Sequence, residues 1–477
     1  MNFKTKSKHS LNFLSSNFVL RAMKSSWFPL VGQILTLIAF ALLVIGGIGV
    51  TTDDAAFARE LRNTNLSNLL VWSYWWPIII IAAILLGRVW CSVCPVEPIT
   101  FLAGRVGLRR KVPRFFKSGW VITFFYALIL LVGIHTLAIH RIPQRMALYM
   151  LMLIAVAVVV SLIYQKRAFC SYVCPVGHLL GLYALISPFE WRADDKSVCK
   201  SCKTKDCFVK KNHYRAFGRS CTSNLYPATI KDNRDCLLCT QCLKACPYDN
   251  LQFSIRRPFA DLFGAVDLRP AQVGFIALVS GFVVYEILSE WPVSKAILKW
   301  VPDRLVNIFG VADPLTGFVS AIVMFIAFPA VLFLAVAFLA RIASGSEATP
   351  FGSAVKTFAL LLVPTMAGAH IIKALLKMTS RIPYWSNALS DPKGITAAHR
   401  IVDKTLIMDK SVPDAIYPAV SYAAAALLLV ALFATLLIFI RSKTVQKHRP
   451  GAKLVLFLGV LGYWCVFAMT ILKWRFS

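Results

Sequence analysis

Residues 236–247 read Cys236-Leu-Leu-Cys239-Thr-Gln-Cys242-Leu-Lys-Ala-Cys246-Pro247, and residues 199–207 read Cys199-Lys-Ser-Cys202-Lys-Thr-Lys-Asp-Cys207. A single cysteine, Cys221, lies between the two runs. Thiolates are soft ligands, and cysteines at spacings of two and three residues can converge on one metal centre. This segment therefore predicts metal binding, and the rest of the chain is interpreted around it.

The second run has the C-x2-C-x2-C-x3-C-P spacing that bacterial ferredoxins use for [4Fe-4S] clusters. In that arrangement three cysteines of one run hold one cluster, and the cysteine before the proline ligates the other. The rule predicts two clusters with these ligands: Cys199, Cys202, Cys207 and Cys246 for the first, and Cys236, Cys239, Cys242 and Cys221 for the second.

The main alternative is a pair of four-cysteine zinc sites, because C-x2-C pairs also suit zinc. The first run keeps this alternative open, since four residues separate Cys202 from Cys207 where the common cluster motif has two. Cys221 also lacks a following proline. The compact second run favours iron–sulfur clusters over zinc.

The composition indicates a membrane protein. The chain has 477 residues, of which 58% are hydrophobic, a mean hydropathy of +0.66 and a formal net charge of +30. A soluble chain of this composition would have too few polar residues to cover its apolar residues. The basic residues flank apolar segments, as membrane topology requires, so the charge does not indicate nucleic-acid binding.

Apolar stretches of about 20 residues predict nine membrane spans: 28–50, 69–87, 120–139, 146–164, 271–288, 315–339, 355–375, 415–440 and 454–472. The predicted fold is an all-α polytopic membrane protein with an inserted α+β 2[4Fe-4S] ferredoxin domain. Its predicted parts are a cytoplasmic N-terminal segment (1–27), a four-helix membrane domain (28–190), the ferredoxin domain (191–257) and a five-helix membrane domain (258–477).

The distribution of basic residues predicts the orientation. Most Lys and Arg residues lie in segments that are internal if the N-terminus is cytoplasmic, and the cysteine-rich segment is one of these. We therefore expect a bacterial inner-membrane protein with a cytoplasmic N-terminus and ferredoxin domain and an external C-terminus. The cytoplasm is reducing, which disfavours disulfides.

Two further cysteine pairs, each ending in proline, follow the second and fourth predicted spans. They read Cys91-Ser-Val-Cys94-Pro95 and Cys170-Ser-Tyr-Val-Cys174-Pro175. Both occupy the inner end of a helix that runs inward, so neighbouring helices would bring four thiols together. The pattern leaves open a third iron–sulfur centre, a redox-active dithiol and cysteines buried as small apolar residues.

Twin motifs of this kind followed by a two-cluster ferredoxin resemble the NapH/NosR-type membrane polyferredoxins, over about residues 69–257. The resemblance implies electron transfer between membrane quinone and a partner reductase or its assembly pathway. It also implies partner subunits. In the family both motifs usually read C-x3-C-P; Cys170–Pro175 matches, whereas the motif at Cys91 is one residue shorter.

Three candidate ionisable residues lie in the outer half of predicted spans: His135, Glu286 and His370. Such groups are costly in a bilayer and suggest function. All three lie in the outer half of spans that run outward, where they would accept protons from a quinol. The two histidines would equally suit a b-type haem. The remaining interpretations are hydrogen-bonded helix contacts and, for Glu286, a side chain that reaches to water.

His213 lies among Lys210, Lys211 and Arg215 in the cysteine-rich segment, and we expect it on a solvated basic face, which would also suit an acidic redox partner. The chain as a whole is predicted to exchange electrons between membrane quinone and a redox partner subunit or soluble carrier. It would then act as the electron-transfer subunit of a quinol dehydrogenase complex. The alternative is an iron–sulfur assembly or regulatory factor without sustained turnover.

Overall fold

The computed structural model describes residues 12–312, 315–345 and 349–476. Residues 1–11 of the predicted N-terminal segment lie outside this part. The chain divides into two compact units: unit 1 comprises Met1–Phe40, Ile81–Arg114 and Ile154–Leu262, and unit 2 comprises Ala41–Ile80, Phe115–Leu153 and Phe263–Ser477. Each is described by itself below.

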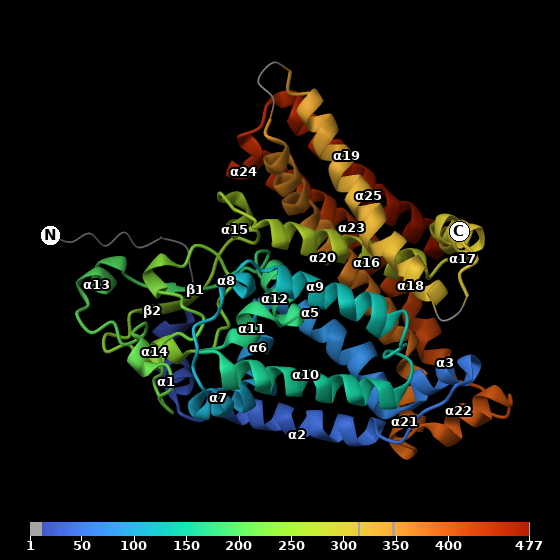
Figure 1. The fold of residues 1–477 in the computed structure, drawn as a ribbon, viewed down its shortest axis with the longest axis horizontal. Coiled ribbons are helices and arrows are strands. Elements are labelled where there is room, and N and C mark those ends of the chain that lie inside the picture. The colour runs from blue at the N-terminus through green and yellow to red at the C-terminus, as the bar shows by residue number, and fades with distance from the viewer. Residues whose placement is uncertain (1–11, 313–314, 346–348, 477) are drawn as a thin grey trace. The chain divides into compact units, whose positions relative to one another are not determined.

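Unit 1 contains short helices around one small sheet (Figure 1). The sheet pairs β1 (Phe189–Ala193) with β2 (Leu251–Ile255) in antiparallel register, with Trp191 opposite Phe253. The other elements of unit 1 are η1 (Phe13–Ser15), α1 (Asn17–Lys24), α6 (Val89–Ser92), α7 (Val96–Val106), α11 (Ala168–Tyr172), α12 (Pro175–Tyr183), α13 (Lys196–Ser201), η4 (Lys210–Asn212), η5 (Pro227–Thr229) and α14 (Gln241–Ala245).

The N-terminal segment belongs to the core of unit 1. Leu14 is buried with Trp191, Leu243 and Leu251, and α1 packs Val19, Leu20 and Met23 against this cluster. The apolar residues of α1 lie on one helical face, which explains why this basic stretch folds onto the cysteine-rich segment. Lys24 pairs with Asp249 at 2.6 Å. The sequence predicted a cytoplasmic N-terminal segment over 1–27 and did not predict this packing.

Unit 2 is built from helices. They are α3 (Ala55–Thr64), α4 (Leu66–Leu69), the π-helix η2 (Leu70–Trp75), α9 (Trp120–Leu128), the π-helix η3 (Ile129–Ile134), α16 (Pro270–Leu288), α17 (Pro292–Ile308), α18 (Leu315–Ile322), the π-helix η6 (Val323–Ala327), α19 (Phe328–Ile342), α20 (Phe351–Ser380), η7 (Ile382–Tyr384), α21 (Trp385–Ser390), α22 (Ile395–Val402), α23 (Ser411–Arg441), α24 (Lys443–Gln446) and α25 (Pro450–Phe476). Helices α2 (Leu30–Gly47), α5 (Trp76–Leu86), α8 (Arg114–Lys117), α10 (Pro143–Ile163) and α15 (Ala260–Phe263) have residues in both units.

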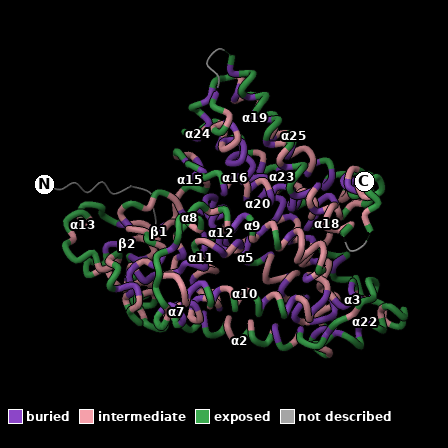
Figure 2. Tube along the Cα trace, viewed as in Figure 1, coloured by how far each residue is buried: buried purple, intermediate pink, exposed green. Residues whose placement is uncertain are grey.

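Helix α20 is the centre of unit 2. Its residues from Phe358 to Ile372 are almost all buried (Figure 2), and α16, α19, α23 and α25 pack around it. Helices on the periphery expose large apolar residues such as Leu429 and Phe433 of α23. Exposed apolar side chains on long helices suit contact with lipid acyl chains.

Eight helical stretches of the described residues are long and apolar enough to cross a bilayer. They correspond to eight of the nine predicted spans. The remaining one, predicted over 120–139, is a shorter apolar helix over Trp120–Ile134 that ends in a π-helical turn. The multi-pass membrane character agrees with the prediction, while the count of nine and the inserted ferredoxin domain remain predictions.

Candidate functional site

The twelve predicted ligand cysteines form three groups of four, and all three groups lie in unit 1. In the first group the thiols of Cys199, Cys207 and Cys246 lie within electrostatic reach of one another and of Cys202. The structure thus brings together the four cysteines that the ferredoxin rule assigns to one cluster. Asn250 donates a hydrogen bond to the Cys199 sulfur at 3.2 Å.

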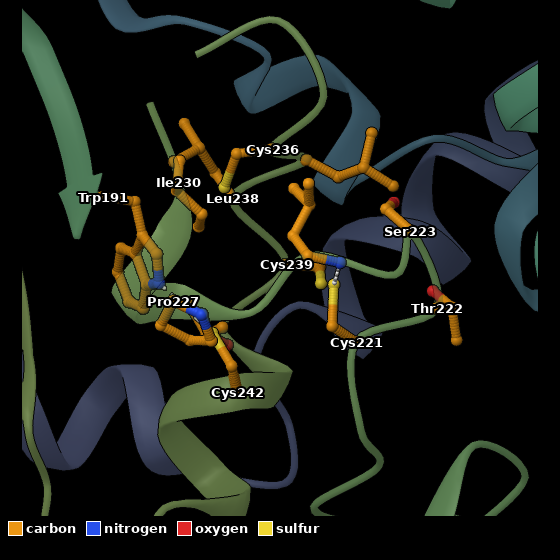
Figure 3. A pocket seen from close by; sticks show the side chains of 13 residues that line it. Trp191, Cys221, Thr222, Ser223, Pro227, Ile230, Cys236, Leu238, Cys239 and Cys242 are labelled. Atoms are coloured by element: carbon orange, nitrogen blue, oxygen red, sulfur yellow. Dashed lines mark hydrogen bonds between the residues drawn. The ribbon is translucent and has the colours of Figure 1, made fainter. Parts of the chain in front are cut away.

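The second group lines a pocket (Figure 3). Its walls include the sulfurs of Cys221, Cys236, Cys239 and Cys242 together with the apolar side chains of η5 and β1. The Trp191 indole donates a hydrogen bond to the Cys242 sulfur at 3.2 Å. Left-handed backbone at Leu238 and Thr240 (φ of 52° and 56°) turns the short Cys236–Cys242 loop back on itself. Three thiols from one loop, with the Cys221 thiol from a separate irregular segment, suit a cubane cluster.

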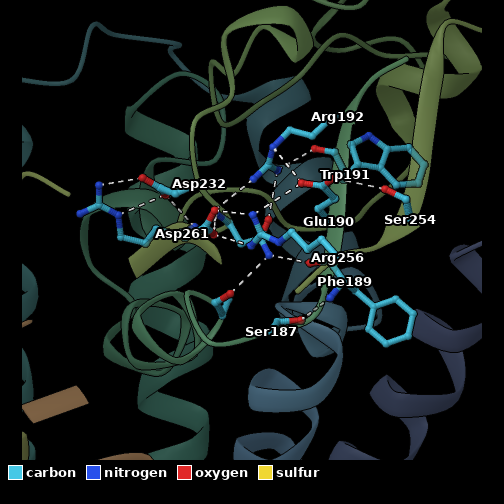
Figure 4. Close-up of polar contacts among 12 residues, drawn as sticks. Ser187, Phe189, Glu190, Trp191, Arg192, Asp232, Ser254, Arg256 and Asp261 are labelled. Carbon is cyan, nitrogen blue, oxygen red and sulfur yellow. Dashed lines mark hydrogen bonds and ion pairs between the residues drawn. The ribbon is translucent and has the colours of Figure 1, made fainter. Parts of the chain in front are cut away.

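An ion-pair network braces the loop that precedes Cys236 (Figure 4). Arg192 of β1 and Arg256, just beyond β2, both pair with Asp261, at 3.5 and 2.5 Å. Asp261 accepts a hydrogen bond from the Asn233 amide at 2.9 Å. The sheet therefore positions the start of the cysteine loop through charged side chains that are largely buried.

The third group consists of the twin-motif cysteines Cys91, Cys94, Cys170 and Cys174. Their thiols lie within electrostatic reach of one another, as expected if the two motifs meet. Cys94 lies just beyond α6, Cys170 is in α11, and Cys174 caps the N-terminus of α12, where its sulfur accepts a hydrogen bond from the Gly177 amide at 3.3 Å.

The environment of this third group bears on the dithiol alternative. Burial raises the pKa of Cys174 to about 12 and raises the pKa of Cys94 and Cys170 as well. A redox-active dithiol needs a thiol whose pKa is lowered. Buried thiols are instead deprotonated when a metal coordinates them, so the donor set and its surroundings suit an iron–sulfur cluster.

Two buried arginines contact this group, and sequence reasoning missed both. Arg88 donates to the Cys91 sulfur at 3.6 Å and to the Arg234 carbonyl at 2.8 Å. Arg167 lies within electrostatic reach of both Cys170 and Cys239, the latter from the second group. The available signal was a repeated R-x-x-C pattern, since Arg88 precedes Cys91 as Arg167 precedes Cys170.

Glu97 of α7 joins Arg167 to a third arginine. Its carboxylate pairs with Arg167 and with Arg219, the latter at 2.5 Å, and all three side chains are buried. The two guanidinium groups hold the pKa of Glu97 down at about 2, although burial opposes this. The triad connects α7, the second Cys-Pro motif and the segment before Cys221.

The expectation that His213 lies on a solvated basic face is wrong. His213 is 3% exposed, and its Nδ1 lies 2.5 Å from the Ser220 hydroxyl. The imidazole is held inside by its contact with Ser220, although its sequence neighbours Lys210 and Lys211 are exposed.

The three candidate membrane residues His135, Glu286 and His370 all belong to unit 2. His135 follows the π-helix η3 and contacts the rings of Tyr285 and Phe325, each at 5.0 Å between centroids. His370 of α20 contacts Phe282 at 6.3 Å, and Phe282 contacts Phe325 at 6.1 Å.

Glu286 lies within electrostatic reach of His370 and His135. It also pairs with Lys373 at 3.6 Å, and its side chain is 25% exposed, so its contact with water remains a prediction. The Nε2 atom of His135 is buried and has no hydrogen-bond partner among the described residues. The structure thus places the three predicted residues around one aromatic cluster.

The zinc alternative concerns single-metal sites. Within the described ranges, no group of three or more His, Cys, Asp or Glu side chains is arranged to hold a single metal ion.

Comparison with known proteins adds independent evidence. Residues 68–114 and 146–193 match the 4Fe-4S binding domain family. The matched segments contain Cys91, Cys94, Cys170 and Cys174, whereas the eight cysteines from Cys199 onward lie beyond them. The match supports iron–sulfur binding by this chain.

Relatives with curated names cover less than half of the chain. "Putative electron transport protein YccM" of Escherichia coli is 24% identical over 255 residues, which are 46% of this chain and 67% of the relative. An uncharacterized protein of Methanocaldococcus jannaschii is 28% identical over 184 residues, or 37% of this chain and 68% of the relative. No solved structure matches the chain. The predicted resemblance to polyferredoxin-type membrane proteins is confirmed.

Proposed function

We propose that this chain conducts electrons between membrane quinone and a redox partner through three [4Fe-4S] clusters, held by the three groups of four cysteines. The observation that carries the proposal is the segregation of twelve of the thirteen cysteines into these groups. The resemblance to a relative named for electron transport supports the same role. When bound, such clusters supply one-electron transfer.

The residues around the three cysteine groups indicate the sequence in which electrons would pass between them. In the first group, the Cys202 sulfur accepts an exposed hydrogen bond from the Lys205 amide, so this group suits exchange with a partner. The second and third groups share Arg167, whose charge reaches Cys239 and Cys170. A cation between two anionic centres reduces the electrostatic repulsion between them. Hydrogen bonds from Trp191 and Arg88 to ligand sulfurs would tune the reduction potentials.

In unit 2, the aromatic cluster around His135 would be the quinone site. Phe325, Phe282 and Tyr285 offer flat apolar surfaces to a quinone ring. His135, with a buried Nε2 atom that lacks a partner in the described part of the chain, is placed to accept a proton released when quinol is oxidised.

Iron analysis of protein purified anaerobically in detergent tests the cluster proposal. We expect about twelve irons and as many sulfides per chain, since each cubane holds about four of each. Cys94→Ser and Cys174→Ser should each lower the iron content by about four. Cys465→Ser is the matched control, because Cys465 of α25 lies outside the three groups. Zinc in place of iron, or iron content unaffected by both variants, would refute the three-cluster assignment.

Stopped-flow reduction by quinol tests the conduit role against an assembly or regulatory role. A conduit must be reduced on the timescale of turnover, about 1–10³ per second for typical enzymes. A sensor or assembly factor needs only slow reduction. His135→Gln should slow reduction while leaving the iron content intact, and His399→Gln, which changes an exposed histidine of α22, should not. Equal rates in both variants would exclude His135 from the quinone site.

A further inference from the structure

A cluster of basic side chains in unit 2 takes no part in the proposed electron path. It contains five cations, contributed by α3, the loop before α10, and the C-terminal end of α20. They are Arg62, Arg141, Lys373, Lys377 and Arg381. The last three are spaced four residues apart, so they follow one face of α20 and its end. We call this set the basic cluster.

The acidic residues nearby do not balance it. Glu286 and Glu290 both pair with Lys373, and Glu60 hydrogen-bonds Tyr384. Among the described residues, no ion pair joins Arg62, Lys377 or Arg381 to a carboxylate. The cluster therefore carries an excess of positive charge at half-buried positions, where solvent screens it only partly.

Several buried donors of the cluster also lack acceptors. Nε of Arg62, Nε of Arg381 and Nε1 of the adjoining Trp72 are inaccessible to water and have no hydrogen-bond partner within the described ranges. Trp72 joins the cluster through His140, whose ring it meets edge-on at 6.4 Å. Arg141 donates to the same imidazole at 3.2 Å. Buried N–H groups without acceptors destabilise a fold, so such a set is uncommon unless a ligand satisfies it.

The pKa of Arg62 agrees with a guanidinium group that has no carboxylate partner among the described residues. Burial, reinforced by the charge of Arg381, lowers the pKa of Arg62 to about 10. An arginine that had acquired a carboxylate partner would show the opposite direction. The dipole of α20 accounts for Lys377 and Arg381 near its C-terminus, but it does not explain why Arg62 and Arg141 converge there from other elements.

From these observations we infer that the basic cluster is a binding site for a phosphate group. The guanidinium groups of Arg62 and Arg381, with the ammonium of Lys377, supply the forked and point-charge donors that phosphate oxygens accept. The site lies at the ends of membrane-spanning helices, so the phosphate belongs either to the headgroup of an anionic phospholipid or to a free phosphate ion.

Binding measurements on the full-length protein in detergent and in nanodiscs test the site. One arm titrates inorganic phosphate against chloride of matched ionic strength and follows thermal unfolding. The other compares nanodiscs of phosphatidylglycerol with nanodiscs of phosphatidylcholine. Stabilisation by phosphate supports the site with a free ion as its ligand, and stabilisation by phosphatidylglycerol alone supports it with a lipid headgroup.

Variants make the test specific. Arg62→Gln and Arg381→Gln should each weaken the response about tenfold or more, since each removes charge-assisted hydrogen bonds. Arg341→Gln, which changes an exposed arginine in the last turn of α19, is the matched control and should respond like the native chain. Far-UV circular dichroism and cluster absorbance confirm that the variants fold. No stabilisation in either arm, or an undiminished response in both cluster variants, would overturn the proposal without affecting the electron-transfer assignment.

Discussion

At the scale of single residues, the charged side chains that surround the cysteines are as important for the proposed sites as the cysteines themselves. Cysteine spacing alone predicts the first two cysteine groups, because cysteines on one short loop are close in sequence as well as in space. Arg88, Arg167 and Glu97 were not identified as functional, because the meeting of their side chains depends on how distant segments pack. The R-x-x-C repeat becomes meaningful only when both arginines are found buried beside the thiols.

The buried triad predicts a stability effect. Arg167→Gln removes one partner of the buried Glu97 carboxylate and should destabilise the protein by about 3 kcal/mol, measured by chemical denaturation of the cluster-loaded protein. Removing a positive charge near Cys170 and Cys239 should also lower the reduction potentials of the adjacent centres in an EPR titration. Arg105→Gln, on the exposed side of α7, should change neither quantity.

His213 predicts a dependence of stability on pH. Burial, together with the charge of Lys166, lowers its pKa from 6.5 to about 4. The unfolded chain therefore binds a proton that the folded chain does not, and stability falls as pH drops from 6.5 towards 4. The loss at pH 5 should be about 2 kcal/mol relative to pH 7.

A pH series of unfolding measurements checks this expectation. His213→Gln should flatten the profile between pH 7 and pH 5, whereas His399→Gln, at an exposed position, should leave it unchanged. Identical profiles for the native chain and His213→Gln would show that the buried imidazole does not control stability in this range.

At the scale of elements, short helices bring the second and third cysteine groups together. Gly181 of α12 approaches the loop before Cys236 so closely that a Cβ atom there would lie 2.6 Å from the Arg234 carbonyl oxygen. That oxygen accepts the hydrogen bond from Arg88. The glycine therefore permits a contact on which both groups depend.

Gly181→Ala should consequently destabilise unit 1 by about 1–3 kcal/mol, as overpacking does, and should reduce iron content through displacement of the Cys236 loop. Thermal unfolding and iron analysis measure the two effects. Gly462→Ala is the control, because nothing lies within 4 Å of its added methyl group. Similar behaviour of the two variants would show that the close approach of α12 is not required.

At the scale of the whole molecule, the number of membrane crossings decides which side the C-terminus occupies. A cytoplasmic N-terminus and an external C-terminus need an odd number of crossings. In the part of the chain that the structure describes, eight helical stretches meet the length requirement, and Trp120–Ile134 would be the ninth. At about 1.5 Å per residue it spans less than the roughly 30 Å of a typical hydrocarbon core, so it would have to cross with help from its flanking residues.

Reporter fusions test this topology. Alkaline phosphatase fused after the C-terminal residue should be active, and a fusion after Lys117 should be inactive, because we expect the C-terminus to be external and Lys117 to be cytoplasmic. Fluorescent protein fusions should give the reverse pattern. A cytoplasmic C-terminus together with a cytoplasmic Lys117 would mean that eight helices cross and Trp120–Ile134 does not.

The sequence by itself determined the membrane character, the positions of most long helices and the grouping of the ferredoxin-type cysteines. These properties depend on apolar length and on ligand spacing, which are local. Only the tertiary structure decided that α1 packs on the cysteine-rich segment, that the two Cys-Pro motifs meet, and that His213 is buried. The proximity of Arg62 to Arg381 is likewise visible only in the tertiary structure. Such contacts join residues far apart in the chain, and they depend on packing and on charge compensation in a buried environment.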